Sequence, residues 1–108
     1  MKRLLYFSTA SADVTQDDVD RIVQAASDAN AQTEISGALA YNGRNFCQVL
    51  EGPDEQVSAL MQRIEADNRH SGIKILDEKP ITNRYFADWT MVAVDELDFS
   101  VVINAMNA

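Results

Sequence analysis

Two apolar segments joined by an Asn-Gly pair constrain the fold of this chain more strongly than any other feature. The segments cover residues 35–41 and 46–50, and Asn42 and Gly43 lie between them. An Asn-Gly pair between two apolar runs favours the tight turn of a β-hairpin, because both residues tolerate positive φ. The sequence therefore predicts two antiparallel strands in the middle of the chain.

A helix is predicted on each side of this hairpin. Thr15 and Asp18 have the spacing of a capping box, and apolar residues follow at helical intervals. The next position on that apolar face is Asn30, so a polar residue closes an inward-facing stripe. The second helix begins after Pro53, which suits the first turn of a helix, and we expect it to extend to about Asn68.

Three further short apolar segments, residues 4–8, 73–76 and 90–94, are predicted to be strands. The resulting order, βαββαββ, is typical of the ferredoxin-like α+β sandwich, an antiparallel-type sheet with two helices on one face. We expect residues 1–95 to form this domain. Residues 96–108 form a C-terminal tail, for which we expect a short helix on the outer face of the sheet.

Side-chain alternation along the strands gives the predicted sheet two apolar faces. If Tyr6, Gln48 and Met91 point toward the helices, the residues directly beside them along each strand point to the opposite face. These are Leu5, Phe7, Cys47, Val49 and Val92. The C-terminal tail is one candidate cover for this face, and a second subunit or a signalling partner is the other. On this ground we predict a homodimer.

Charge and cysteine content exclude several classes of function. The formal net charge of −8, with Lys and Arg scattered along the chain, disfavours binding to nucleic acid. The single cysteine, Cys47, excludes an internal disulfide and a metal site of several thiolates, which fits the cytoplasm. The first apolar run is too short for a signal peptide or for a membrane span of about 20 residues.

Polar residues on the helix-facing side of the sheet are the candidate site. Tyr6, Asn30 and Gln48 are all predicted to be buried there, and a buried polar group without a partner costs about 1–3 kcal/mol. A bound polar heterocycle would satisfy all three. Arg63 and Asp67, four residues apart on the second predicted helix, could contact the same ligand or pair with each other.

Each of these residues also has an ordinary structural interpretation. Tyr6 could be a core tyrosine bonded to the backbone, and Asn30 could be a helix C-cap. Arg63 and Asp67 could form a surface pair of little energetic value. His70, the only histidine, has no catalytic partner at a recognisable spacing and is interpreted as structural.

Five motifs in order resemble the BLUF domains, a family that senses blue light using FAD. They are Leu5-Tyr6-Phe7-Ser8, Ile35-Ser36-Gly37-Ala38-Leu39, Phe46-Cys47-Gln48-Val49-Leu50-Glu51-Gly52, Asp67-Asn68-Arg69-His70 and Arg84-Tyr85-Phe86-Ala87-Asp88-Trp89-Thr90-Met91. The resemblance covers nearly the whole chain. It implies a photoreceptor that binds FAD non-covalently, with FMN and riboflavin as alternatives, and that passes its signal to a downstream protein without catalytic turnover.

The resemblance also implies roles for single residues. Tyr6 matches the electron donor to the photoexcited flavin, because a phenol can lose an electron and then its proton. Gln48 matches the switch, because a carboxamide that rotates or changes tautomer exchanges its donor and acceptor groups.

Other positions match the family's flavin contacts and its responsive strand. Asn30, Arg63 and Asp67 match positions that hydrogen-bond the flavin ring or its side chain. Trp89 and Met91 match the late strand that responds to the switch.

Three positions qualify the resemblance. Ala29 stands where family members often carry His or Asn, so one flavin contact is expected to be missing, and Ser36 replaces the usual Thr. Cys47 neighbours Gln48 on a strand and so points to the opposite face, and we expect no thiol adduct with the flavin.

Two other functions compete with the photoreceptor hypothesis. An acylphosphatase-like hydrolase would need an arginine in the loop after the first strand, and residues 8–13 contain none. A light-independent ligand-binding or dimerisation module of the same fold is the alternative that remains.

Overall fold

The computed structural model describes residues 1–86, 92–94 and 99–107. Its elements along the chain are β1 (Lys2–Ala10), α1 (Gln16–Ala31), β2 (Ser36–Tyr41), β3 (Asn45–Gly52), α2 (Asp54–Glu65), β4 (His70–Pro80), β5 (Val92–Val94) and α3 (Ser100–Met106).

The strands form one sheet in the order β4-β1-β3-β2-β5. β1 is antiparallel to both β3 and β4, and β2 is antiparallel to β3, as the βαββαββ order predicts. β5 pairs with β2 in parallel, which adds a mixed edge to the sheet. The ferredoxin-like α+β fold is therefore confirmed.

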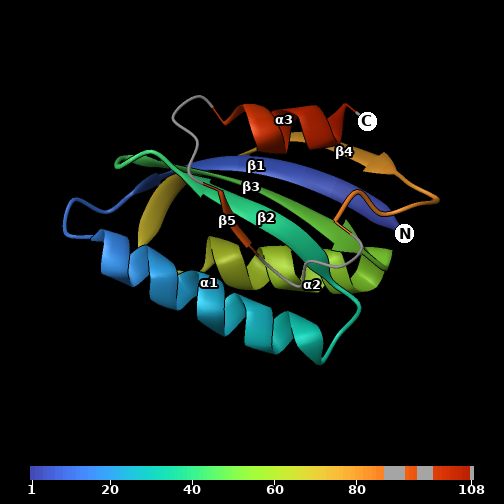
Figure 1. The fold of residues 1–108 in the computed structure, drawn as a ribbon, viewed down its shortest axis with the longest axis horizontal. Helices are drawn as coiled ribbons and strands as arrows, with labels where there is room; N and C mark the ends of the chain where they lie inside the picture. Colours follow the sequence, from blue (N-terminus) through green and yellow to red (C-terminus); the bar gives the residue numbers. More distant parts are fainter. Residues whose placement is uncertain (87–91, 95–98, 108) are drawn as a thin grey trace.

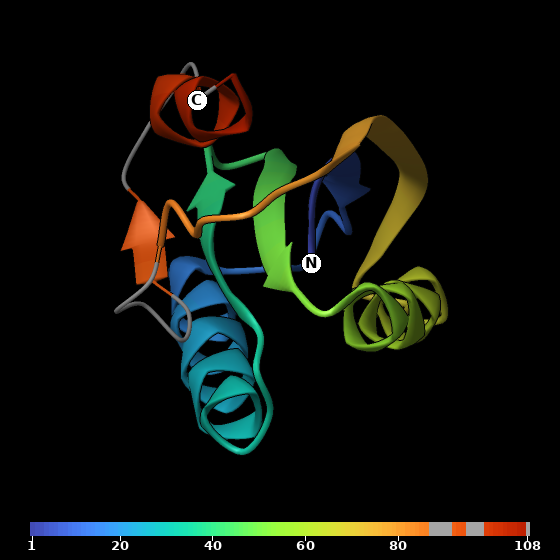
Figure 2. The same cartoon turned by 90° about the vertical axis from the view of Figure 1, so that its right-hand side faces the viewer.

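The helices lie on both faces of the sheet. α1 and α2 lie side by side on one face, and α3 lies on the opposite face (Figures 1 and 2). The core under α1 and α2 includes Leu4, Tyr6, Val19, Leu39, Phe46, Leu50, Val57 and Met61. The core under α3 includes Leu5, Ala38, Cys47, Val49, Phe86, Val102, Ala105 and Met106.

The predicted alternation of faces is confirmed where the structure describes it. Tyr6 belongs to the core under α1 and α2, whereas Leu5, Cys47 and Val49 belong to the core under α3. Met91 and the orientation of Val92 lie outside the described part of the chain. The division into residues 1–95 and 96–108 stays a prediction, because residues 95–98 are also outside it.

Local hydrogen bonds explain the hairpin. The side-chain oxygen of Asn42 accepts the backbone N–H groups of Arg44 and Asn45 at 3.0 and 2.8 Å. Gly43 has a φ of 94°, a conformation that disfavours side chains other than hydrogen. The Asn-Gly pair thus supplies both the acceptor and the positive φ that this turn requires.

The second helix is shorter than predicted. It ends at Glu65 and not near Asn68, because the N–H of Asp67 bonds the carbonyl of Ile64 in a tighter turn. The side chain of Asp67 then accepts the N–H of Arg69 at 2.9 Å, which turns the chain into β4. Asp67 therefore lies in a connecting turn, where it is not placed to pair with Arg63 along a helix.

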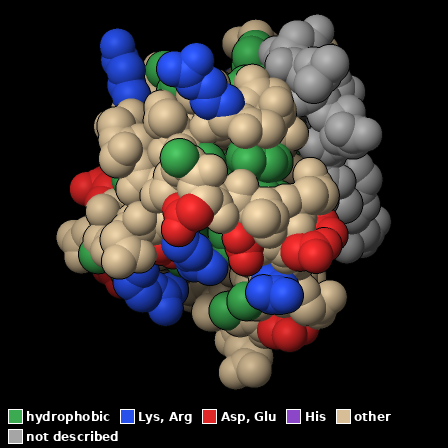
Figure 3. Space-filling model, turned by 90° about the vertical axis from the view of Figure 1, so that its left-hand side faces the viewer, with side chains coloured by type: hydrophobic (Ala, Val, Ile, Leu, Met, Phe, Trp, Pro, Cys, Tyr) green, Lys and Arg blue, Asp and Glu red, His purple; other side chains and the backbone are tan. Residues whose placement is uncertain are grey.

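Charges of both signs are mixed on the surface. On the face drawn in Figure 3, acidic and basic side chains lie next to one another and are not gathered into a basic stripe. Among the described helices, none is long and apolar enough to cross a membrane.

The capping box of α1 gives a test of the local structure. The Thr15 hydroxyl accepts the Asp18 N–H at 3.2 Å, and the Asp18 carboxylate accepts the Thr15 N–H at 2.9 Å. We expect Thr15→Ala to lower the free energy of unfolding by about 1 kcal/mol. Urea denaturation should show this as a lower midpoint with an unchanged slope. Thr15→Ser keeps the hydroxyl and should lower the free energy of unfolding less than Thr15→Ala does. Equal midpoints for the two variants would contradict the role of the hydroxyl as a cap.

Candidate functional site

A cavity of about 290 Å³ opens between the sheet and the two helices α1 and α2. Its apolar wall includes Ile22, Leu39, Phe46, Leu60 and Ile64. Its polar lining consists of Tyr6, Asn30, Gln48, Arg63, Asp67, Arg69 and His70. A mostly apolar cleft with a few polar groups is the usual form of a small-molecule site. The structure therefore brings together all five predicted ligand contacts: Tyr6, Asn30, Gln48, Arg63 and Asp67.

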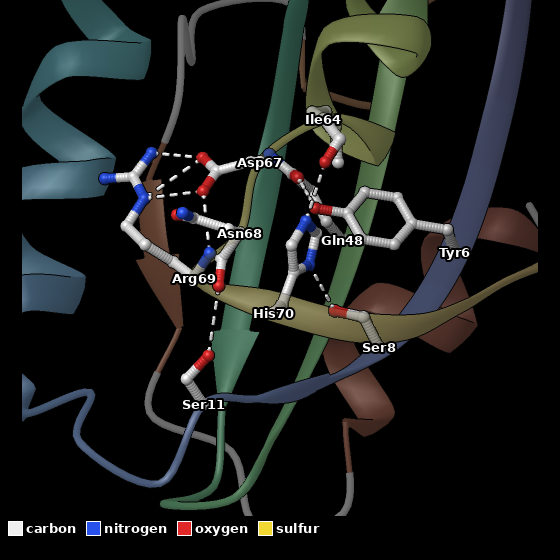
Figure 4. A network of polar contacts seen from close by, with 9 residues as sticks. All are labelled: Tyr6, Ser8, Ser11, Gln48, Ile64, Asp67, Asn68, Arg69 and His70. Carbon is white, nitrogen blue, oxygen red and sulfur yellow. Dashed lines mark hydrogen bonds and ion pairs between the residues drawn. The ribbon is translucent and has the colours of Figure 1, made fainter.

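Tyr6 and Gln48 form the centre of this cavity. They stand opposite each other on β1 and β3, and the hydroxyl of Tyr6 donates a hydrogen bond to the side-chain oxygen of Gln48. Both side chains are buried. Figure 4 shows the two side chains pointing toward each other. Tyr6 is a core residue, but the interpretation in which its hydroxyl bonds the backbone is wrong, because the hydroxyl bonds the side chain of Gln48.

Burial keeps the Tyr6 hydroxyl protonated. Loss of contact with water raises the pKa of this phenol far above its ordinary value, and the nearby Cys47 and Asp67 raise it further. A neutral phenol can both donate and accept, and here it donates to the side-chain oxygen of Gln48. A rotated Gln48 amide could instead donate to the same hydroxyl, so this hydrogen bond is compatible with two orientations of the amide.

His70 is held at both ring nitrogens at the base of the cavity. Its Nε2 lies 2.7 Å from the carbonyl of Ile64, which can only accept, so this nitrogen carries a proton. In the neutral ring Nδ1 then carries no proton, so it accepts a hydrogen bond from the Ser8 hydroxyl, at 2.7 Å. The ring also meets Tyr6 edge to face, with centroids 6.3 Å apart. His70 thus connects β1, β4 and the end of α2, and its structural interpretation fits these contacts.

Asp67 is paired with Arg69, two residues further along the chain. The Nε atom of Arg69 lies 2.9 and 3.0 Å from the two carboxylate oxygens, and its Nη2 atom also bonds the carboxylate. Figure 4 shows this fork beside Gln48 and His70. Of the two alternatives for Asp67, a pair with Arg63 is therefore wrong, because Asp67 pairs with Arg69 within the turn.

The Arg69 guanidinium changes the acidity of Asp67. Its hydrogen bonds hold the pKa of the carboxyl at about 2, compared with an ordinary value of 3.8. The carboxylate is then charged throughout the neutral range and stays an acceptor. The rim of the cavity thus carries a neutralised Asp67–Arg69 pair next to the exposed guanidinium of Arg63.

Asn30 lies in the last turn of α1 and is only 4% exposed. The helix continues to Ala31 and its C-cap is Gln32, so the alternative reading of Asn30 as the cap is wrong. Ala25, Ala26 and Ala29 line the same wall of the cavity. Because alanine has the smallest side chain with a Cβ, this wall leaves room for a flat ligand.

The remaining predicted site residues differ in position. Trp89 and Met91 lie outside the described residues. Cys47 is buried on the opposite face, and this burial raises the pKa of its thiol to about 11. It is therefore a protonated thiol, and its predicted position on the face away from the cavity is confirmed. Within the described ranges, no group of three or more metal-ligating side chains could hold a metal ion.

The cavity as a whole suits a flat heterocycle with polar edges. Its walls are apolar, whereas Gln48 and Asn30 offer amide groups that both donate and accept hydrogen bonds. Arg63 offers only donors, and Asp67 offers only acceptors. A flavin ring, with carbonyl oxygens and ring nitrogens along one edge, fits this donor set.

Comparison with known proteins decides the family. The family model described as sensors of blue-light using FAD matches residues 1–92. The chain belongs to the BLUF family. BLUF domains are blue-light sensor modules that bind flavin and signal to partners.

Relatives of known name and structure agree with this assignment. Photoactivated adenylate cyclase subunit beta of Euglena longa is 35% identical over 94 residues, which cover 86% of this chain and 11% of that protein. The blue light- and temperature-regulated antirepressor BluF of Escherichia coli (strain K12) is 37% identical over 70 residues, 65% of this chain and 17% of that protein.

The dark-state structure of BlrB, a BLUF protein, matches this fold with a TM-score of 0.84 and 35% identity, over 93% of this chain and 76% of that one. The chain therefore spans about a tenth of the length of the cyclase subunit, and three quarters of BlrB.

Arg69 and the alanine wall are site residues that the sequence analysis did not single out. The signal for Arg69 was an aspartate two residues before it at a predicted helix end, a spacing typical of an Asx turn. The alanines carried no signal, since alanine is common in any helix. Their position only becomes informative once α1 is placed over the sheet.

The Asp67–Arg69 pair predicts a pH dependence. The pKa of Asp67 is about 2 in the fold and 3.8 ordinarily, so its contribution to stability is complete above about pH 3.8 and disappears as the pH falls toward 2. We expect Arg69→Ala to move the Asp67 pKa back toward 3.8, as measured by carboxyl NMR titration. Arg21→Ala, at an exposed arginine paired with Asp18, is the control and should leave it unchanged. An Asp67 pKa that stays low in Arg69→Ala would contradict the pairing.

Proposed function

We propose that this BLUF domain binds FAD non-covalently in the cavity between the sheet and the helices α1 and α2. FMN and riboflavin share the same ring and are the alternative ligands. The observation that carries the proposal is the buried hydrogen bond between Tyr6 and Gln48 in the wall of that cavity. When bound, the flavin supplies blue-light absorption and an excited state that accepts an electron.

Tyr6 is proposed as the electron donor. Its phenol is neutral and buried, so an electron lost from the ring leaves a strongly acidic hydroxyl with an acceptor, the Gln48 oxygen, already in contact. The proton can therefore leave along the existing hydrogen bond. Electron and proton transfer from Tyr6 need no prior movement of the protein.

Gln48 is proposed as the switch. In the structure its oxygen accepts the Tyr6 hydroxyl. Rotation of the amide, or a change of tautomer, exchanges the group that faces Tyr6 and the group that faces the ligand. The light state is then a different pattern of hydrogen bonds to the flavin, which changes its absorption without a covalent bond.

Asn30, Arg63 and Asp67 are proposed to hold the flavin. Asn30 reaches the cavity from α1, Arg63 from α2 and Asp67 from the turn before β4. Arg63 is a donor for carbonyl oxygens, and the Asp67 carboxylate is an acceptor for N–H or hydroxyl groups. Trp89 and Met91 are proposed, from the family resemblance alone, as the residues that respond to the switch.

The output of the domain is proposed to pass to another protein, without catalytic turnover in the domain itself. Two relatives are named as a cyclase subunit and an antirepressor, which supports an effector of this general kind. The predicted homodimer would use the outer sheet face, part of which packs against α3. We place the protein in the cytoplasm because its single cysteine is a buried free thiol.

Replacing the Tyr6 hydroxyl tests the proposed donor. We expect Tyr6→Phe to keep the bound flavin and to lose the normal reversible red shift of its visible absorption after blue light. Tyr85→Phe removes an equivalent hydroxyl from a half-exposed tyrosine outside the cavity and should keep the full response. A normal photocycle in Tyr6→Phe would refute the mechanism.

Replacing the amide of Gln48 tests the proposed switch. Gln48→Leu preserves approximate size but has no donor or acceptor, so illumination should leave the flavin spectrum without its red shift. Gln62→Leu changes an exposed glutamine on α2 and should behave like the unmodified protein. If purified protein takes up no flavin even after FAD is added, the light-independent ligand-binding or dimerisation module becomes the better account.

A further inference from the structure

A buried ion pair lies on the face of the sheet opposite the flavin cavity. The Nε atom of Arg3 donates to Oε2 of Glu51 at 2.8 Å, and the two side chains are 4% and 0% exposed. The residues stand opposite each other on β1 and β3. This pair does not line the cavity, and the proposed photochemistry does not use it.

The Glu51 carboxylate also holds the loop that follows β4. It accepts the backbone N–H of Tyr85 at 2.7 Å and that of Phe86 at 2.6 Å. Phe86 is buried in the core under α3. Glu51 therefore fixes the described end of the loop, residues 81–86, by two charge-assisted hydrogen bonds.

Arg84 ties the same loop to the backbone of the sheet. Its Nη1 atom donates to the Ser36 hydroxyl at 2.9 Å and to the Glu51 carbonyl at 3.2 Å. Its Nη2 atom donates to the carbonyl of Glu34. Both the side chain and the backbone of Glu51 thus contact the loop, and we call this set of bonds the Glu51 anchor.

Stability alone does not account for this anchor. Removing two charges from water is costly, and buried ion pairs can often be replaced by apolar residues without loss of stability. A carboxylate with all its hydrogen bonds formed holds the groups around it in one defined position. The Glu51 anchor therefore specifies where the loop lies relative to β3.

β3 connects this anchor to the proposed switch. Gln48 and Glu51 are three residues apart on one strand, so their side chains face opposite sides of the sheet, and only Gln48 lines the cavity. β3 is held between β1 and β2, and a Cβ on Gly37 would stand 2.1 Å from the Val49 carbonyl oxygen. The backbones of β2 and β3 are therefore closely packed at Val49, between Gln48 and Glu51. Packed elements of this kind shift as units and do not deform gradually.

We propose that Glu51 is a positioning residue that couples the loop of residues 81–86 to the hydrogen-bond state of Gln48. The inference rests on the proposed function, since it needs a switch at Gln48. In darkness the Glu51 anchor holds the loop against β3. In the light state a displacement of β3 weakens the bonds from Tyr85 and Phe86 to the Glu51 carboxylate.

Hydrogen exchange of the flavin-loaded protein in darkness and under blue light tests the coupling. We expect the amides of Tyr85 and Phe86 to exchange about five- to 150-fold faster in the light, the usual range of coupling between sites. Equal exchange in both conditions, in protein that shows the red shift, would overturn the proposal while the proposed function stands. Absence of the red shift itself would overturn the proposed function and the coupling with it.

The variant Glu51→Gln separates coupling from simple structural support. It keeps an acceptor oxygen but loses the charge, so both amides should exchange fast in darkness, with no further increase in the light. The red shift should remain, because Glu51 does not line the cavity. Glu78→Gln removes a charge paired with Lys2 at the surface and should keep the light-dependent difference. A light-dependent difference that survives in Glu51→Gln would overturn the proposal, and if this variant does not fold, the comparison in the unmodified protein still decides.

Discussion

The hydrogen bond between the Tyr6 hydroxyl and the Gln48 amide is the interaction around which this structure is organised. Both groups are buried, and a buried polar group must be paired or it lowers the stability of the fold. The pairing requires that β1 and β3 be neighbours in one register, with both side chains on the face under α1 and α2. The same constraint leaves a polar centre in an otherwise apolar cavity, which is where a flavin ring can be recognised.

The two faces of the sheet carry different features of the domain. The face under α1 and α2 contains the cavity, whereas the face under α3 contains Cys47, the Arg3–Glu51 pair and the buried Phe86. β3 contributes to both faces because its side chains alternate. A single central strand therefore carries the proposed switch on one side and the anchor of the following loop on the other.

Much of this arrangement could be predicted from the sequence, because it depends on short-range patterns. The Asn42-Gly43 turn, the Thr15 capping box and the alternation along β1 and β3 each have a local cause, and the structure confirms them. The end of α2 and the pairing of Asp67 with Arg69 depend on competition between a helical bond and a turn, which spacing alone does not resolve. The Glu51 anchor joins residues more than thirty positions apart, so no sequence window contains it.

The central claim is that light changes which hydrogen bonds Gln48 makes to a bound flavin. Infrared difference spectroscopy, light minus dark, on protein loaded with flavin carrying ¹³C at its C4 carbonyl tests this directly. The account predicts that the labelled carbonyl stretch changes its wavenumber in the light, because a change in the hydrogen bonds that this carbonyl accepts changes the strength of the carbonyl bond, and that Gln48→Leu abolishes this change. A labelled band that does not move while the visible absorption shifts to the red would contradict the account.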